Sequence, residues 1–252
     1  LELLTTSNSH IYLKINSKLK RNSIFTSELD FKFKTIASGL YISPGETFEK
    51  AISASEFSFQ NPSIQQISKG TEQIEIRGTW FDFNAVEDTQ GIEISLRFEL
   101  DSNFPAVRMA TSWHYLAPPK RREYQPESKS PWFIDSLEFN LLRASESHKP
   151  LKVLNKPGFG QPLISKFLFI GLEHPAAASS VYDGIPKLSF HIAKKLSELN
   201  ETAPSLVIGI SDENQAIDAL HRYIEQRRMA KGGSATSPYL VYNTWYDVRQ
   251  MT

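Results

Sequence analysis

The chain has no cysteine among its 252 residues. This absence excludes disulfide bonds, thiolate nucleophiles and cysteine-ligated zinc sites. It leaves the cellular compartment open, because a secreted domain of this size can fold without disulfide bridges. The fold is therefore expected to rest on a hydrophobic core alone.

The sequence also lacks an excess of charge and a long hydrophobic run. Lys plus Arg and Asp plus Glu both number 28, so no overall field attracts nucleic acid or anionic lipid. No stretch reaches the roughly 18 apolar residues of a membrane-spanning helix, and residues 167–172 fit a buried strand better. We therefore expect neither a nucleic-acid partner nor a membrane.

Common catalytic and cofactor motifs are missing as well. No Gly-rich phosphate loop precedes a helix, no histidine pair has metal-ligand spacing, and no Gly-x-Ser-x-Gly elbow occurs. We accordingly predict no metal and no organic cofactor. The many carboxylates of the first 210 residues alternate along expected strands, where a solvated sheet face needs them with or without chemistry.

Alternation of apolar and polar residues with a period of two dominates the first two-thirds of the chain. The clearest case is 92–100, and 107–115 lies at the right distance to pair back on it as a hairpin after a turn at 101–103. Further strands are expected near 47–60, 79–86, 132–143, 164–172, 187–193 and 205–210. About a dozen short strands with almost no helix indicate two large packed antiparallel sheets.

The pattern changes at Ser211. Asp212 can cap the start of a helix with Gln215 three residues later. One side of that helix is expected to be apolar through Ile217, Leu220, Tyr223 and Ile224. The sequence Lys-Gly-Gly-Ser at 231–234 then ends the helix and begins a linker.

Two irregular segments allow a structural and a functional interpretation. Residues 117–131 combine four prolines with six charged residues, which is typical of a solvated loop, and a flap over a binding face is the alternative. Residues 167–184 contain Gly171, Glu173, His174 and Pro175, which fit a strand end and turn. A functional role for this second segment stays open at this point.

The six histidines are scattered. His114 and His191 fall in expected strands and could converge as an acid/base pair of a sugar-binding sandwich. Ordinary hydrogen-bonded or exposed histidines are the simpler explanation.

The segment Tyr-Leu-Val-Tyr-Asn-Thr-Trp-Tyr-Asp at 239–247 combines a predicted buried strand with an aromatic and polar end. Trp245 offers a flat face on which a pyranose ring can stack, and Asn243 and Asp247 offer partners for hydroxyl groups. In (β/α)₈ barrels, ligand groups sit at the carboxyl ends of strands. The alternative is a hydrophobic strand whose aromatic end serves packing only.

Three segments together carry a resemblance to a known family. They are Asp-Ser-Asn-Phe-Pro-Ala-Val-Arg at 101–108, Phe-Ile-Gly-Leu-Glu-His-Pro at 169–175, and Leu-Val-Tyr-Asn-Thr-Trp at 240–245. With the order of sandwich, helix and strand, they resemble the melibiase-like α-galactosidases, retaining glycoside hydrolases with an N-terminal supersandwich before a catalytic barrel. The resemblance implies a mainly β, galactose mutarotase-like supersandwich of two antiparallel sheets, followed by one linker helix and a terminal strand.

The same resemblance implies an organisation and a function. Residues 1–210 would form the supersandwich, 211–234 the helix and linker, and 235–252 the start of a truncated catalytic barrel. Trp245 would help to form the pocket for the non-reducing-end sugar, with Asn243 and Asp247 as neighbours. The nucleophile and the acid/base, both aspartates, would lie beyond residue 252, so these 252 residues are expected to be inactive alone.

The expected partner is thus a carbohydrate substrate of the complete enzyme, with α-galactosides or similar glycosides as the class. The sandwich would shape the substrate entrance or an oligomer interface, so a homo-oligomer is allowed. Two rival hypotheses remain: a self-sufficient mutarotase-like epimerase that uses His114 and His191 with a carboxylate, and a non-catalytic carbohydrate-binding module.

Overall fold

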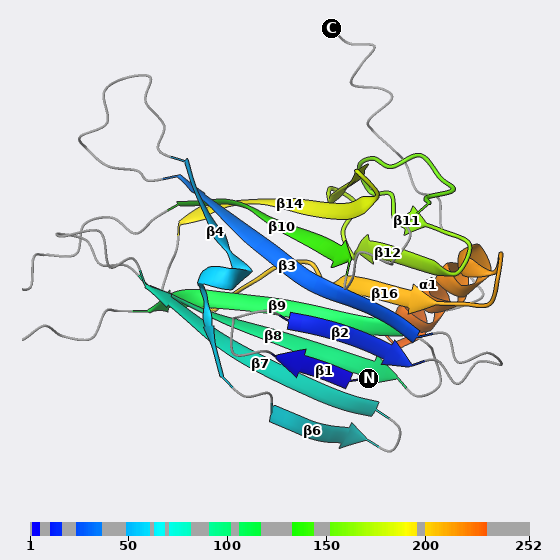
Figure 1. Cartoon of the computed structure of the whole chain (residues 1–252), viewed down its shortest axis with the longest axis horizontal. Coiled ribbons are helices and arrows are strands. Elements are labelled where there is room, and N and C mark those ends of the chain that lie inside the picture. Colours follow the sequence, from blue (N-terminus) through cyan, green and yellow to red (C-terminus); the bar gives the residue numbers. More distant parts are fainter. Residues whose placement is uncertain are drawn as a thin grey trace, which may run out of the picture.

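The chain folds into two antiparallel β-sheets and one helix in the part that the structure describes (Figure 1). This structure is a computed structural model, which describes residues 2–5, 11–16, 24–36, 49–60, 63–68, 71–81, 91–101, 106–116, 133–143, 152–195 and 200–230. The prediction of a mainly β chain is confirmed.

The first sheet has the strand order β1-β2-β3-β10-β14-β13, and β4 also pairs with β3. All of its described pairings are antiparallel. Its strands are β1 (Glu2–Thr5), β2 (Ile11–Asn16), β3 (Ile24–Ile36), β4 (Glu49–Ser53), β10 (Phe133–Arg143), β13 (Ala178–Tyr182) and β14 (Ile185–Lys195).

The second sheet has the order β11-β12-β16-β9-β8-β7-β5, with β15 on β9 and β6 on β7. Its strands are β5 (Ser58–Phe59), β6 (Ser63–Ser68), β7 (Thr71–Phe81), β8 (Gly91–Asp101), β9 (Ala106–Leu116), β11 (Leu163–Ile164), β12 (Leu168–Leu172), β15 (Glu201–Thr202) and β16 (Leu206–Ile210). A short 3₁₀ helix, η1 (Ala54–Glu56), connects the two sheets between β4 and β5.

One hydrophobic core lies between the sheets. Alternate residues of β8 and β9, such as Ile94 and Trp113, are buried together with Leu137 and Phe139 of β10 and Leu188 of β14. The polar residues between them face outward because successive side chains of a strand point to opposite faces. Each sheet therefore buries one face and turns the other away from the core.

The predicted hairpin is confirmed, with β8 and β9 paired from Gly91 opposite Leu116 to Leu100 opposite Val107. The expected strand at 164–172 is wrong as a single element. It divides into β11 and β12, because the segment turns at Ser165, whose N–H donates to the carbonyl of Leu168 at 2.8 Å. The segment 163–172 is an apolar run interrupted only by Ser165 and Lys166, and a single strand can also contain two such residues, so the sequence did not reveal this reversal.

Other expected strands differ in extent. The expected strand at 47–60 is interrupted, with β4 and β5 separated by η1. Residues 79–81 are the end of the long β7, and 82–86 lie outside the described residues. The expectations for 132–143, 187–193 and 205–210 are met by β10, β14 and β16, whereas β13 follows a run of alanines and was not expected.

Helix α1 (Ala216–Ala230) packs on the outward face of the second sheet, against β12 and β16 (Figure 1). A small second core joins Ala219 and Tyr223 of the helix to Phe169 and Val207 of those strands. The ring of Phe169 lies over Gly209, where a Cβ atom would collide with it. The glycine therefore leaves room for the Phe169 ring to lie across the neighbouring strand beneath the helix.

The predicted start and apolar face of this helix need correction. Gln215, not Asp212, takes the N-cap position, because its carbonyl accepts the first helical hydrogen bond, from the N–H of Ala219. Before it, the N–H of Asn214 donates to the carbonyl of Lys166 at 2.7 Å, which holds 211–214 in a turn. Ile217 and Ile224 were expected to be buried and are half-exposed.

Candidate functional site

A charged cluster lies where β9, β12 and α1 meet, and Glu173 is at its centre. Leu172 of β12 points into the core, so the next residue, Glu173, points to the outward face that α1 covers. Its carboxylate accepts a hydrogen bond from the Tyr223 hydroxyl at 2.6 Å and another from Arg108 Nε at 2.9 Å. Glu173 thus connects the edge of the sheet to a central strand and to the helix.

The cluster continues with two further charged residues. Arg108 Nη1 donates to Glu99 Oε2 on β8 at 3.3 Å, so one guanidinium joins two carboxylates. On the helix, Arg227 Nε lies 3.5 Å from Glu173 Oε1. That nitrogen is buried but makes no hydrogen bond with any described residue, so this contact is an ion pair only.

The cluster favours a charged carboxylate at Glu173. Burial opposes ionisation, but the hydrogen bonds from Tyr223 and Arg108 and the positive charges of Arg108 and Arg227 outweigh it and hold the pKa of Glu173 below its usual value. Burial, followed by the hydrogen bond to this carboxylate, raises the pKa of Tyr223. A glycosidase acid needs a raised pKa instead, so Glu173 does not have the properties of a general acid.

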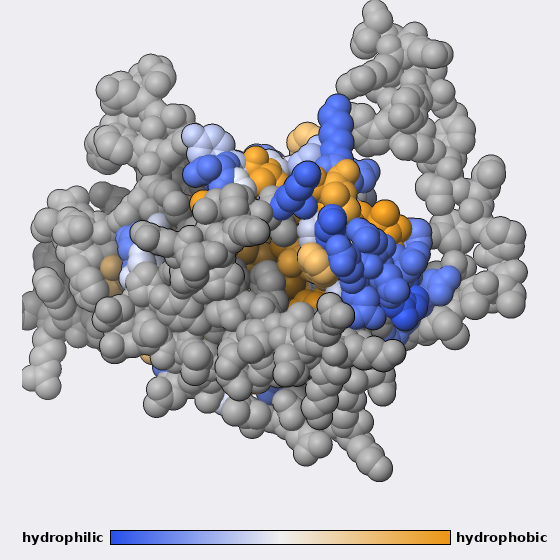
Figure 2. Space-filling model, turned by 45° about the vertical axis from the view of Figure 1, so that its right-hand side comes forward, coloured by the Kyte–Doolittle hydropathy of each residue, from blue (hydrophilic) through white to orange (hydrophobic). Residues whose placement is uncertain are grey.

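A groove with a volume of about 380 Å³ runs beside this cluster along α1. Gly171, His174 and Pro175 form one of its walls, and Leu220, Tyr223 and Ile224 form the helical wall. Figure 2 shows hydrophobic side chains next to a hydrophilic surface on this side of the molecule. The groove is therefore mainly apolar, with charged groups at one end.

The ring of His174 is fixed by its own neighbours. It packs edge-on against Phe190 at 4.7 Å between ring centres, and its Nδ1 accepts a hydrogen bond from the N–H of Ala176 at 3.1 Å. These contacts, with the turn that follows β12, match the structural interpretation of residues 169–175 as a strand end and turn.

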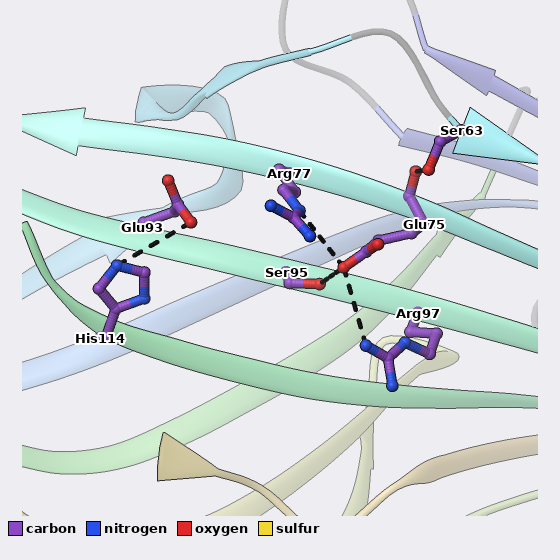
Figure 3. Close-up of polar contacts among 7 residues, drawn as sticks. All are labelled: Ser63, Glu75, Arg77, Glu93, Ser95, Arg97 and His114. Carbon is purple, nitrogen blue, oxygen red and sulfur yellow. Dashed lines mark hydrogen bonds and ion pairs between the residues drawn. The ribbon is translucent and has the colours of Figure 1, made fainter. Parts of the chain in front are cut away.

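The outward face of the second sheet carries a second set of polar contacts (Figure 3). Glu75 Oε1 accepts a hydrogen bond from Ser95 Oγ at 2.6 Å and from Arg77 Nε at 3.4 Å, and Arg97 lies 3.9 Å away. The hydrogen bond from Ser95 is the main cause that keeps the pKa of Glu75 low. Ser95 and Arg97 lie on the neighbouring strand β8 and Arg77 on the same strand as Glu75, which is the arrangement expected for structural carboxylates on a polar face.

His114 and His191 do not come together. His114 lies on β9 of the second sheet, with Nε2 3.9 Å from Glu93 Oε1 (Figure 3). His191 lies on β14 of the first sheet, with Nδ1 3.8 Å from Asp135 Oδ2. Both alternate along their strands with core residues, Trp113 and Ile192, so they point outward from different sheets. The expectation that they share one concave face is wrong for this reason.

The predicted sugar-binding residues Asn243, Trp245 and Asp247 lie outside the described residues, as does the loop 117–131. The charged cluster was not predicted. Glu173 belongs to the unusual segment 167–184, and Arg108 is the last residue of the segment 101–108 that carries part of the family resemblance. The sequence therefore drew attention to each segment, but it did not predict the contact between Arg108 and Glu173, because 65 positions separate the two residues.

No protein-family model matches the chain, no curated protein matches it in sequence, and no solved structure matches it in fold. Within the described part of the chain, no helix is long and apolar enough to cross a membrane. Any function must therefore be inferred from the residues of this chain and the contacts among them.

Proposed function

We propose that the chain is the N-terminal, non-catalytic region of a retaining glycoside hydrolase that acts on α-galactosides or similar glycosides. In this proposal the described β body is a supersandwich of the galactose mutarotase-like type. The nucleophile and the acid/base are aspartates beyond residue 252, and the sugar is cleaved by double displacement. Trp245, with Asn243 and Asp247, belongs to the sugar pocket of the complete enzyme.

The observation that carries this proposal is the order of the parts. Two antiparallel sheets are followed by one helix, α1, and α1 is packed on the outside of the sandwich and ends at Ala230. A Gly/Ser-rich linker comes next, and then the Leu-Val-Tyr-Asn-Thr-Trp segment at 240–245. This is the arrangement that the resemblance to the melibiase-like enzymes implies.

The carboxylates of the described residues support a non-catalytic role for the sandwich. Glu173 and Glu75 both have lowered pKa values, which suits charged residues in ion pairs and opposes the role of a general acid near neutral pH. Arg108 lies between Glu99 and Glu173 and donates a hydrogen bond to each. The mutarotase-like rival loses its main support, because His114 and His191 lie on different sheets.

The test compares this chain with the longer polypeptide encoded by its gene. The gene should continue past Thr252 with about 250 to 300 residues of alternating strands and helices, as a (β/α)₈ barrel requires. The longer protein should hydrolyse 4-nitrophenyl α-galactoside, and residues 1–252 should not. Trp245→Ala in the longer protein should lower kcat/KM by about tenfold through the lost ring contact.

A stop codon directly after Thr252, or hydrolysis by residues 1–252 alone, would refute the proposal. If the longer protein binds galactosides in titration calorimetry but does not hydrolyse them, the rival hypothesis of a non-catalytic carbohydrate-binding module replaces the proposal. Interconversion of sugar anomers by residues 1–252 would revive the epimerase.

A further inference from the structure

The groove between the helix and the sandwich has the size and lining of a small-molecule site. Its volume of about 380 Å³ is within the range of pockets that hold small organic ligands. Its apolar lining comes from the second sheet, the adjoining loops and α1, through Gly171, Val207, Pro162, Pro175, Leu220 and Ile224. This lining favours a ligand with an apolar body, because apolar surface that leaves water stabilises a complex.

Arg227 supplies hydrogen-bond donors without a partner at one end of the groove. Its Nε lies 3.5 Å from Glu173 Oε1 but is buried without a hydrogen bond, and its Nη groups have no hydrogen bond to any described residue. The side chain is 33% exposed, so a ligand in the groove can reach it. A guanidinium group binds a carboxylate through parallel hydrogen bonds, and more strongly than it binds a neutral acceptor.

His174 supplies a further donor at the same end. Its Nδ1 accepts a hydrogen bond from the N–H of Ala176 at 3.1 Å, so a neutral ring carries its hydrogen on Nε2. The edge-on contact with Phe190 holds the ring, and Nε2 has no hydrogen bond to a described residue. His174 follows Glu173 in the chain, and Arg227 has its ion pair with Glu173, so both donors lie at the Glu173 end of the groove.

Glu173 also lines this end, but its carboxylate is already bound within the cluster. It accepts hydrogen bonds from Tyr223 at 2.6 Å and from Arg108 at 2.9 Å. The cluster also shows that one guanidinium can join two carboxylates, because Arg108 does so with Glu99 and Glu173. A second carboxylate beside Arg227 would repeat this arrangement, with the ligand in place of Glu99.

We propose that the groove binds a small carboxylate that has an apolar body, with its carboxylate at Arg227 and His174 and its body along α1 and the second sheet. This site is separate from the sugar pocket of the proposed function and does not depend on it. Because the walls belong to the helix and to the sandwich, the bound ligand also fastens α1 to the sheet. The fold should therefore become more stable as the ligand concentration rises.

Titration calorimetry of residues 1–252 with 4-phenylbutyrate tests the class of ligand. Two matched compounds show which part of the molecule is recognised. 4-Phenylbutyramide keeps the apolar body but lacks the charge, and acetate keeps the carboxylate but lacks the apolar body. Each should bind at least about tenfold more weakly than 4-phenylbutyrate.

Substitutions test the two donors. Arg227→Gln should weaken the binding of 4-phenylbutyrate about tenfold or more but leave the binding of the amide nearly unchanged. His174→Phe, which keeps a ring against Phe190, should weaken the binding of the acid about threefold. The matched control is Arg222→Gln, because Arg222 is exposed on the same helix and does not line the groove. This control should bind 4-phenylbutyrate as the native chain does.

Thermal unfolding gives a second readout. At about ten times its Kd, 4-phenylbutyrate should raise the Tm of the native chain by about 3–6 °C, and the same concentration should raise that of Arg227→Gln much less. The site would be overturned by a lack of binding up to about 10 mM 4-phenylbutyrate, by equal binding of the amide, or by equal losses in Arg227→Gln and Arg222→Gln. Hydrolysis of galactosides by the longer protein bears only on the proposed function, so the two proposals can fail separately.

Discussion

Replacing Glu173 by glutamine should loosen the attachment of α1 to the sandwich. The substitution keeps the shape of the side chain but removes the charge to which Tyr223, Arg108 and Arg227 are directed. The glutamine side chain also places its NH₂ group, a hydrogen-bond donor, against at least one of these three donors, and two donors cannot form a hydrogen bond with each other. We therefore expect Glu173→Gln to lower the free energy of unfolding and to do so without changing the fold.

The magnitude follows from the contacts. A hydrogen bond to a charged group contributes about 1.5–3 kcal/mol, and Glu173→Gln loses one of the two and weakens the other. The Glu173 and Arg108 side chains are 22% and 23% exposed, so water screens part of the effect. The expected loss is about 2–3 kcal/mol, or a fall in Tm of about 4–12 °C for a chain of this size.

Urea unfolding followed by circular dichroism at pH 7 measures this loss. The matched control is Glu213→Gln, since Glu213 pairs with Lys166 at 3.5 Å while both side chains are more than half exposed. That pair should contribute less than about 0.5 kcal/mol. If the two variants differ by less than about 0.5 kcal/mol, the cluster does not stabilise the fold as argued.

The stability difference between the native chain and Glu173→Gln should depend on pH. The pKa of Glu173 is lower in the folded chain than in the unfolded chain, where it is about 4.3. The ionised carboxylate therefore stabilises the fold above about pH 4.3, and this contribution is lost as the pH falls through the folded pKa. The stability difference between the native chain and Glu173→Gln should shrink below about pH 4.

Three other perturbations test separate contacts. Burial, followed by the hydrogen bond to a glutamate, raises the pKa of Tyr223, so the native chain should lose stability above about pH 10 more steeply than Tyr223→Phe in unfolding curves. Ser95→Ala should raise the pKa of Glu75 in an NMR titration and cost about 1 kcal/mol. Gly209→Ala should cost about 1–3 kcal/mol in urea because of the aromatic ring over it, whereas Gly158→Ala, with open space around it, should cost much less.

The strands were predictable where one face is buried and the other is not. In β8 the core residues Ile92, Ile94, Leu96 and Phe98 alternate with polar ones, and β9 shows the same period, so the hairpin followed from the sequence. The β11–β12 turn did not, because Ser165 holds it through its own backbone and hydroxyl, and the segment carries no glycine, proline or asparagine at that point to mark a turn. An apolar run reports burial, and it does not show where the chain reverses.

The helix was predictable as an element but not in its exact position. Asp212 is a good N-cap residue in isolation, yet the backbone of 211–214 is bound to Phe167 and Lys166 instead. These contacts come from more than 40 positions away, so no local rule contains them. The apolar period did identify Ile217 and Ile224 as one side of the helix, although the sandwich covers the neighbouring side.

The exposure of Ile217 and Ile224 has a physical cause separate from that of the N-cap error. A helix on a single surface needs one apolar side, and that side here consists of Ala216, Ala219 and Tyr223, with Leu220 at its edge. The two isoleucines extend this apolar side beyond the sheet, so the sandwich leaves about half of each side chain exposed. The helical period therefore locates the apolar side of a helix, but it does not determine how much of that side the neighbouring sheet covers.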